Sequence, residues 1–284
     1  MSLPAFLPYL LLAQIGPNPA TGNVGDVADE LRNRPPREAA AQDAPQSAAP
    51  SRLTQCLQRT RQDPQAALDY AQAWRETASE TELAQSAHCA GLALVRLQRF
   101  DDALRIFDAA REEVVAGNPA YRARLGGMAG HAALAGGDAE AALAQFDSAI
   151  IDAIGGADAS LAAGLEIDKA RALVTLERNE EAVAALERAR GADADDPRAW
   201  LLSATLSRRM DRLPEAQAQI EQAVLLAPQD PAIGLEAGVI AALSGRTMQA
   251  RQSFESVIAV APESDEATRA RKYLEQLTPD EPAP

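Results

Sequence analysis

The chain has 284 residues, 47% of them hydrophobic, so it is long enough to bury a substantial core. Its formal net charge of −14 argues against nucleic acid as a general partner, because phosphate binding requires clustered cations. Aromatic residues make up only 4%, and small residues, above all alanine, fill the apolar positions, which favours closely packed helices.

The N-terminal segment contains a short apolar run from Ala5 to Ala13. This run is too short to span a bilayer as a helix, so we predict no transmembrane segment. It has the character of the apolar region of a secretory signal, and we predict a possible signal peptide over residues 1–20. No Lys or Arg precedes Arg32, so the usual positive flank is missing. We expect a periplasmic or secreted location, with the cytoplasm as the alternative.

Proline placement divides the rest of the chain. Eight of the 18 prolines lie in residues 1–50 and three in the last six residues. Residues 21–50 follow no helical or strand period, and we predict a flexible Pro/Ala-rich linker there and a disordered tail over residues 278–284. Between them, over residues 51–277, each proline is predicted to stand where a helix starts or has just ended.

The two cysteines, Cys56 and Cys89, stand 33 residues apart and have no metal-ligand spacing. They could form one disulfide or be two buried free thiols.

One pattern recurs six times over residues 51–277. A small residue is followed four positions later by a large apolar residue, and three positions after that by a smaller apolar one. These spacings place all three residues on one face of a helix. The six copies are Ala66/Tyr70/Ala73, Ala103/Phe107/Ala110, Ala142/Phe146/Ala149, Ala182/Leu186/Ala189, Ala216/Ile220/Ala223 and Ala250/Phe254/Val257.

A second small residue lies twelve positions before each of the last five copies. These residues are Gly91, Gly130, Ala170, Ala204 and Gly238. Such small residues let two helices touch, and we expect each to contact the paired helix near the leading alanine of its copy. A unit of this kind cannot bury its apolar face alone, so the units must stack.

The pattern resembles the tetratricopeptide repeat (TPR) family, whose period is 34 residues. The leading alanines are spaced by 37, 39, 40, 34 and 34 residues, so the last three copies keep that period. The resemblance implies an all-α, right-handed superhelical solenoid of about six helix-turn-helix repeats. A capping helix, from Asp265 to Leu277, would close it. It also places Cys56 and Cys89 on the first helices of adjacent repeats, so the two sulfurs could meet.

The resemblance further implies a concave groove lined by the first helix of each repeat. Thirty projected lining positions hold seven arginines and no Asp or Glu. The third repeat contributes Arg124, Gly127, His131, Leu134 and Ala135, and the fourth contributes Gly164, Ile167, Arg171, Val174 and Thr175. We expect a peptide to be held by Arg96, Arg124, His131, Arg171, Arg198, Leu201, Arg208, Arg209, Leu235, Val239 and Leu243. The alternative interpretation is that the inner face is low in charge only because its residues were selected for packing.

No motif of an enzyme is present: the sequence has no nucleophile elbow, no phosphate-binding glycine loop and no HExxH motif. We therefore predict no catalytic residue, no cofactor and no metal. His88 and His131 fall at lining positions of neighbouring repeats, and a metal site would need a third ligand. Two surface histidines are the favoured interpretation.

The predicted function is a protein–protein interaction scaffold that binds an extended or helical, acidic segment of a partner in the Arg-lined groove. Leucine and valine near the C-terminal end would form an apolar subsite. The alternative is a structural subunit of an envelope or membrane-associated assembly, which docks through its convex face or its N-terminal segment. The Arg-rich composition, with Lys169 and Lys272 as the two lysines, suggests a bacterial protein.

Overall fold

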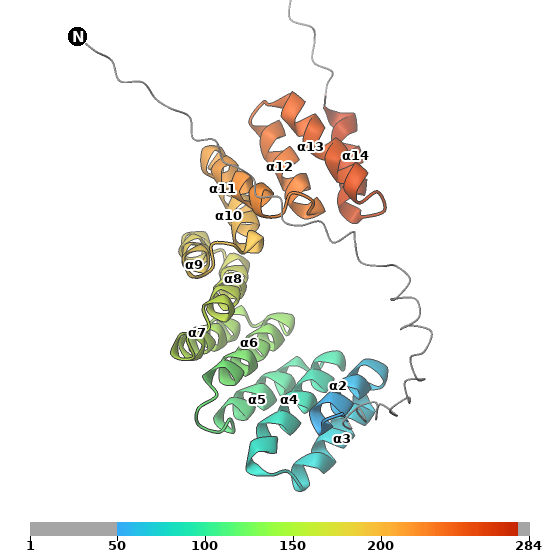
Figure 1. The fold of residues 1–284 in the computed structure, drawn as a ribbon, viewed down its shortest axis with the longest axis vertical. Helices are drawn as coiled ribbons and strands as arrows, with labels where there is room; N and C mark the ends of the chain where they lie inside the picture. The colour runs from blue at the N-terminus through green and yellow to red at the C-terminus, as the bar shows by residue number, and fades with distance from the viewer. Residues whose placement is uncertain (1–49, 278–284) are drawn as a thin grey trace, which may run out of the picture. The chain divides into compact units, whose positions relative to one another are not determined.

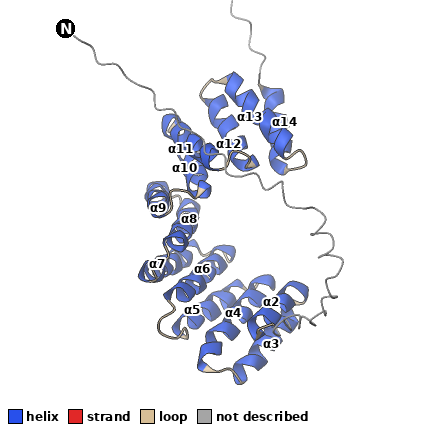
Figure 2. Ribbon diagram, viewed as in Figure 1, coloured by secondary structure: helices blue, strands red, loops and turns tan. Residues whose placement is uncertain are grey.

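The computed structural model describes residues 50–277, and this part of the chain contains thirteen α-helices and no strand (Figure 1 and Figure 2). The predicted all-α repeat fold is confirmed. The possible signal peptide, residues 21–49 of the predicted linker and the predicted tail lie outside the described residues. The helices are α2 (Arg52–Gln62), α3 (Pro64–Glu76), α4 (Glu80–Arg96), α5 (Phe100–Glu112), α6 (Pro119–Ala135), α7 (Ala139–Gly155), α8 (Ala159–Thr175), α9 (Asn179–Ala192), α10 (Pro197–Arg209), α11 (Leu213–Leu226), α12 (Pro231–Leu243), α13 (Thr247–Val260) and α14 (Asp265–Gln276).

The ends of these helices follow from local chemistry. Many helices begin after an Asp, Asn or Ser whose side chain accepts a hydrogen bond from a first-turn amide, as Asp138 does from Ala141 at 2.9 Å. The prolines stand where the sequence predicted. Pro64, Pro119, Pro197, Pro214 and Pro231 lie in the first turns of helices, while Pro228 and Pro262 follow helices that have ended.

Each repeat pairs a first helix, here called helix A, with a second, here called helix B. The A helices are α2, α4, α6, α8, α10 and α12, and the B helices are α3, α5, α7, α9, α11 and α13. Every helix contacts its neighbours in the sequence, and contacts also join α6 to α8, α8 to α10 and α10 to α12. Stacking along the chain therefore buries the apolar face of each repeat.

The predicted contact between helix A and helix B is present at the three glycines. A Cβ atom placed on Gly91 would lie 2.5 Å from the ring of Phe107, and one on Gly130 would lie 2.5 Å from Phe146. Gly238 meets Phe254 in the same way. The small residue thus faces the large residue of its copy, one helical turn beyond the leading alanine. Each of the three phenylalanines is buried.

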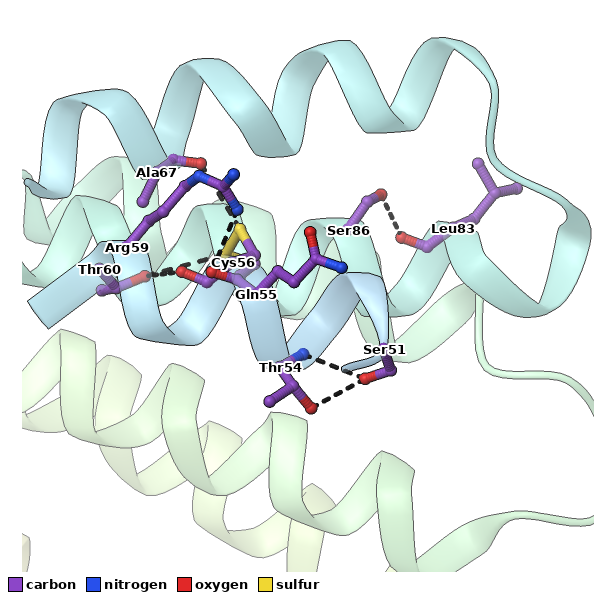
Figure 3. The surroundings of a disulfide bond; sticks show 10 residues. Ser51, Thr54, Gln55, Cys56, Arg59, Thr60, Ala67, Leu83 and Ser86 are labelled. Carbon is purple, nitrogen blue, oxygen red and sulfur yellow. Dashed lines mark hydrogen bonds between the residues drawn. A yellow bond between two sulfur atoms is a disulfide. The ribbon is translucent and has the colours of Figure 1, made fainter. Parts of the chain in front are cut away.

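A disulfide joins Cys56 on α2 to Cys89 on α4, with 6.1 Å between their Cα atoms. Both cysteines are fully buried. Figure 3 shows the surroundings, where the Thr60 hydroxyl donates a hydrogen bond to the Cys56 carbonyl at 3.1 Å. The bond therefore connects the A helices of the first two repeats.

A buried ion pair that the sequence pattern does not predict joins α5 to α7. Arg111 is 8% exposed, and its Nη2 atom lies 2.7 Å from a carboxylate oxygen of Asp152. The absence of a side chain at Gly126 makes room for it, because a Cβ atom there would lie 3.1 Å from the Arg111 Nε. Arg111 precedes two glutamates at the end of α5, and this pattern is typical of a solvated helix end. Its burial depends on the neighbouring repeat, which supplies both Gly126 and Asp152.

Candidate functional site

A cavity of about 480 Å³ opens between the A helices α6 and α8. Its floor is made by Gly127 and Met128 of α6 and by Leu161, Gly164 and Leu165 of α8. The two glycines leave this space open, since a side chain at either position would project into the cavity or against its wall. The predicted lining residues that the cavity brings together are Arg124, Gly127, His131, Gly164 and Arg198.

Arg124 and Arg198, which line this cavity, and Arg171, which lies next to it, are paired with carboxylates of the protein itself. Arg171 contacts Asp168 at 2.5 Å, Arg198 contacts Asp196 at 2.6 Å and Arg124 approaches Asp158 at 3.8 Å. The sequence predicted a positive inner face without Asp or Glu, and this prediction is wrong around the cavity. The reason is geometric. Asp158 caps α8 and Asp196 caps α10, while Asp168 stands one residue beyond a lining position. None of these three aspartates is therefore among the thirty projected lining positions.

His131 shares one of these carboxylates. Its Nε2 atom lies 2.8 Å from Asp168, on the neighbouring A helix, and its ring is exposed. Burial raises the pKa of Asp168, but the hydrogen bonds and charges of His131 and Arg171 outweigh burial and hold that pKa below its usual value. Asp168 is therefore ionised at neutral pH and links α6 to α8.

His88 departs from the expected surface position. Its Nδ1 atom lies 3.1 Å from the hydroxyl of Tyr121 on α6, and its ring packs near Phe107. Burial lowers the pKa of His88 and raises the pKa of Tyr121 to about 12. The described residues contain no group of three or more side chains arranged to hold a metal ion.

The C-terminal arginines divide between two environments. Arg208 turns toward α12 and contacts Glu236 at 2.6 Å, so it is neutralised within the protein. Arg209 and Arg171 line a smaller cavity of about 190 Å³ between α8 and α10. Among the described residues, neither Arg209 nor Arg96 has an ion-pair partner. Of the three arginines expected to concentrate charge here, only Arg209 is left without an internal carboxylate among the described residues, because Arg171 pairs with Asp168 and Arg208 with Glu236.

The expected apolar subsite is largely covered. Leu235 is only 8% exposed and packs in a cluster with residues of α13 and α14, and Val239 packs against the same cluster. The helix α14 contacts α12 where the A helix of a further repeat would lie, which explains the burial. Leu201 is partly buried, so of the predicted subsite only Leu243 stands clearly exposed, at 57%.

The family model described as tetratricopeptide repeat matches residues 90–157 and 167–231. The chain is a tetratricopeptide repeat protein. Members of this family are generally scaffolds for protein interactions rather than enzymes. Among curated proteins, no sequence matches this TPR protein.

Solved structures agree on the fold. PilW, described as a widely conserved type IV pilus biogenesis factor, is 17% identical, with 78% of this chain and 96% of that chain covered and a TM-score of 0.60. Pseudomonas aeruginosa pilF is 12% identical, with 78% and 96% covered and a TM-score of 0.59. A thermophilic TPR protein of Thermus thermophilus is 20% identical, with 68% and 99% covered and a TM-score of 0.51.

No helix among the described residues of this TPR protein combines the length and the apolar character needed to cross a membrane.

Proposed function

We propose that this TPR protein binds an extended or helical segment of a partner protein in the cavity between α6 and α8. The observation that carries the proposal is the cavity itself, because it lies at the predicted lining positions of two A helices and combines an apolar floor with exposed polar rims. A concave site with a few convergent polar groups is the usual form of a binding site.

We favour an acidic segment as the ligand. The arginines would attract its carboxylates only at short range. Arg124, Arg171 and Arg198 each keep more than half of the side chain exposed. A guanidinium carries five N–H donors, so donors remain for a carboxylate of the partner after the internal pair is made. Three arginines and three aspartates cancel in net charge, and we therefore expect little long-range steering and a weak dependence of affinity on salt.

The test of this site fills the cavity without disturbing the fold. A Cβ atom at Gly164 would meet nothing within 4 Å, so Gly164→Leu places a side chain in the cavity. Gly191 on α9 is a matched control, because a Cβ atom there also meets nothing within 4 Å. A photo-crosslinking amino acid at position 164 should capture the native partner, and one at position 191 should not. Binding of that partner should then weaken more than tenfold with Gly164→Leu and stay unchanged with Gly191→Leu.

Docking through the B helices is the alternative function, in which the protein is a structural subunit of an envelope or membrane-associated assembly. Capture from position 191 alone, or full affinity of the Gly164→Leu variant, would favour that alternative and reject binding between α6 and α8.

We also propose that the protein works in an oxidising compartment, periplasmic or secreted, of a bacterium. The buried disulfide between Cys56 and Cys89 supports this location, because structural disulfides are rare in the cytosol. Mass spectrometry of protein purified from its native cell should find the two cysteines oxidised and a mature N-terminus within or just after residues 1–20. Two free thiols and an intact residue 1 would place the protein in the cytoplasm instead.

A further inference from the structure

A second cavity, of about 290 Å³, lies between the B helices α3 and α5. We call it the outer channel. Its floor is the A helix α4, which contributes Ala87, Ala90 and Leu94, and its walls include Leu68 of α3 and Ile106 of α5. The small side chains of Ala87 and Ala90 leave an apolar space between the two B helices. The space is large enough for one or two bulky side chains of a partner.

The outer channel faces away from the groove positions. A helix turns by about 100° per residue, so Ala87, Ala90 and Leu94 lie on one side of α4. The groove positions His88 and Arg96 lie on the opposite side. A ligand in the outer channel would therefore approach from the other side of the A helices and leave the cavity between α6 and α8 free.

Charged residues stand around the outer channel. Arg75 of α3 donates a hydrogen bond to Glu113 just after α5, at 2.9 Å, and this ion pair joins the two walls. Arg99, which precedes α5, and Arg105 on α5 both contact Asp102, and both arginines are more than half exposed. The single carboxylate of Asp102 is therefore shared by two guanidinium groups. The rim carries one uncompensated positive charge in a chain whose net charge is −14.

We propose that the outer channel is a second docking site for a protein segment. A large apolar side chain of the partner enters between α3 and α5, and a neighbouring carboxylate of the same segment binds Arg99 and Arg105. The uncompensated positive charge of the rim favours a partner segment that carries a carboxylate, because hydrogen bonds between a guanidinium and a carboxylate are stronger than those between neutral groups. With a segment also bound between α6 and α8, the protein is an adaptor that joins two partners. This joining role rests on the proposed function, whereas the outer channel itself does not.

The test uses a synthetic peptide, acetyl-Ser-Glu-Leu-Phe-Glu-Ser-amide, and the full ¹⁵N-labelled chain. Saturable NMR shift changes should appear in α3, α4 and α5. The same peptide with Gln in place of both Glu residues should bind about tenfold more weakly. With Arg99→Gln and Arg105→Gln together, the two peptides should bind alike, and Arg99→Lys with Arg105→Lys should restore the preference for the Glu peptide.

Two further variants locate the site. Ala109 lies at the outer channel on α5 and is exposed, so Ala109→Trp should block the peptide without touching the core. Ala144 is an exposed alanine of the B helix α7, and Ala144→Trp should leave binding unchanged. Gly164→Leu should also leave it unchanged, which separates this site from the one between α6 and α8. The proposal is overturned if no peptide binds, if Ala109→Trp binds normally, or if decanoate binds there more tightly than the peptide, which would indicate a small-molecule site.

Discussion

At the scale of single residues, the contact between His88 and Tyr121 makes stability depend on pH in both directions. Burial lowers the pKa of His88, so the unfolded chain binds a proton more readily, and stability falls as the pH drops below about 6.5. Burial raises the pKa of Tyr121, so stability also falls as the pH rises above about 10. Both residues favour the folded state most between these limits, where both are neutral.

Replacing His88 tests the acid side of this dependence. His88→Gln keeps a hydrogen-bonding side chain beside the Tyr121 hydroxyl but cannot titrate. We expect the loss of stability between about pH 7.5 and about pH 5.5, measured by urea unfolding, to be smaller in His88→Gln than in the original chain. An unchanged loss would show that other groups, such as the carboxylates, control this range.

At the scale of helix pairs, two glycines of adjacent A helices have opposite roles. Gly130 lies against the buried ring of Phe146, and a Cβ atom there would overlap the ring. Gly164 faces open space. Alanine is the better helix former by about 0.5–1 kcal/mol, so the same substitution should have opposite effects at the two positions.

We expect Gly130→Ala to destabilise the protein by about 1–3 kcal/mol, because overpacking against Phe146 outweighs the gain in helix propensity. Gly164→Ala should raise stability by up to about 1 kcal/mol. Chemical denaturation of both variants, with circular dichroism as the readout, checks the pair. Effects of the same sign would mean that helix propensity alone governs these positions and that the contact with Phe146 is unimportant.

At the scale of the whole array, stability in a stack of repeats is approximately a sum of local terms, because each repeat contacts only its neighbours. The helix α2 lies at the N-terminal end of the described array and buries only Cys56 and Thr60. Its other apolar residues, Leu53 and Leu57, are only partly buried, so the disulfide to Cys89 is a major tie between α2 and α4.

Removing the disulfide should therefore have a local effect. We expect Cys56→Ser together with Cys89→Ser to cost about 2–4 kcal/mol in the stability of the first repeats. Hydrogen exchange should speed up in α2 and α3 and stay unchanged in α12 and α13. Uniformly faster exchange along all helices would show instead that the array unfolds as one cooperative unit.

Sequence alone was sufficient for the repeat architecture. The spacing of Ala103, Phe107 and Ala110, and of the equivalent residues in other copies, predicts both the helices and their pairing. Prolines and acidic caps mark where helices begin. These are local properties, set by helix geometry and by contacts within one repeat, so a single sequence displays them.

The charges of the candidate site were decided by tertiary structure. Asp168 pairs with His131 across two repeats, Glu236 pairs with Arg208 across two others, and α14 covers Leu235. A list of lining positions cannot show these contacts, because a lining side chain can meet a carboxylate at the adjacent position or at the cap of the next helix. Neutralisation thus depends on how successive repeats are placed beside one another. That placement is a property of the stacked helices and not of any one repeat's sequence.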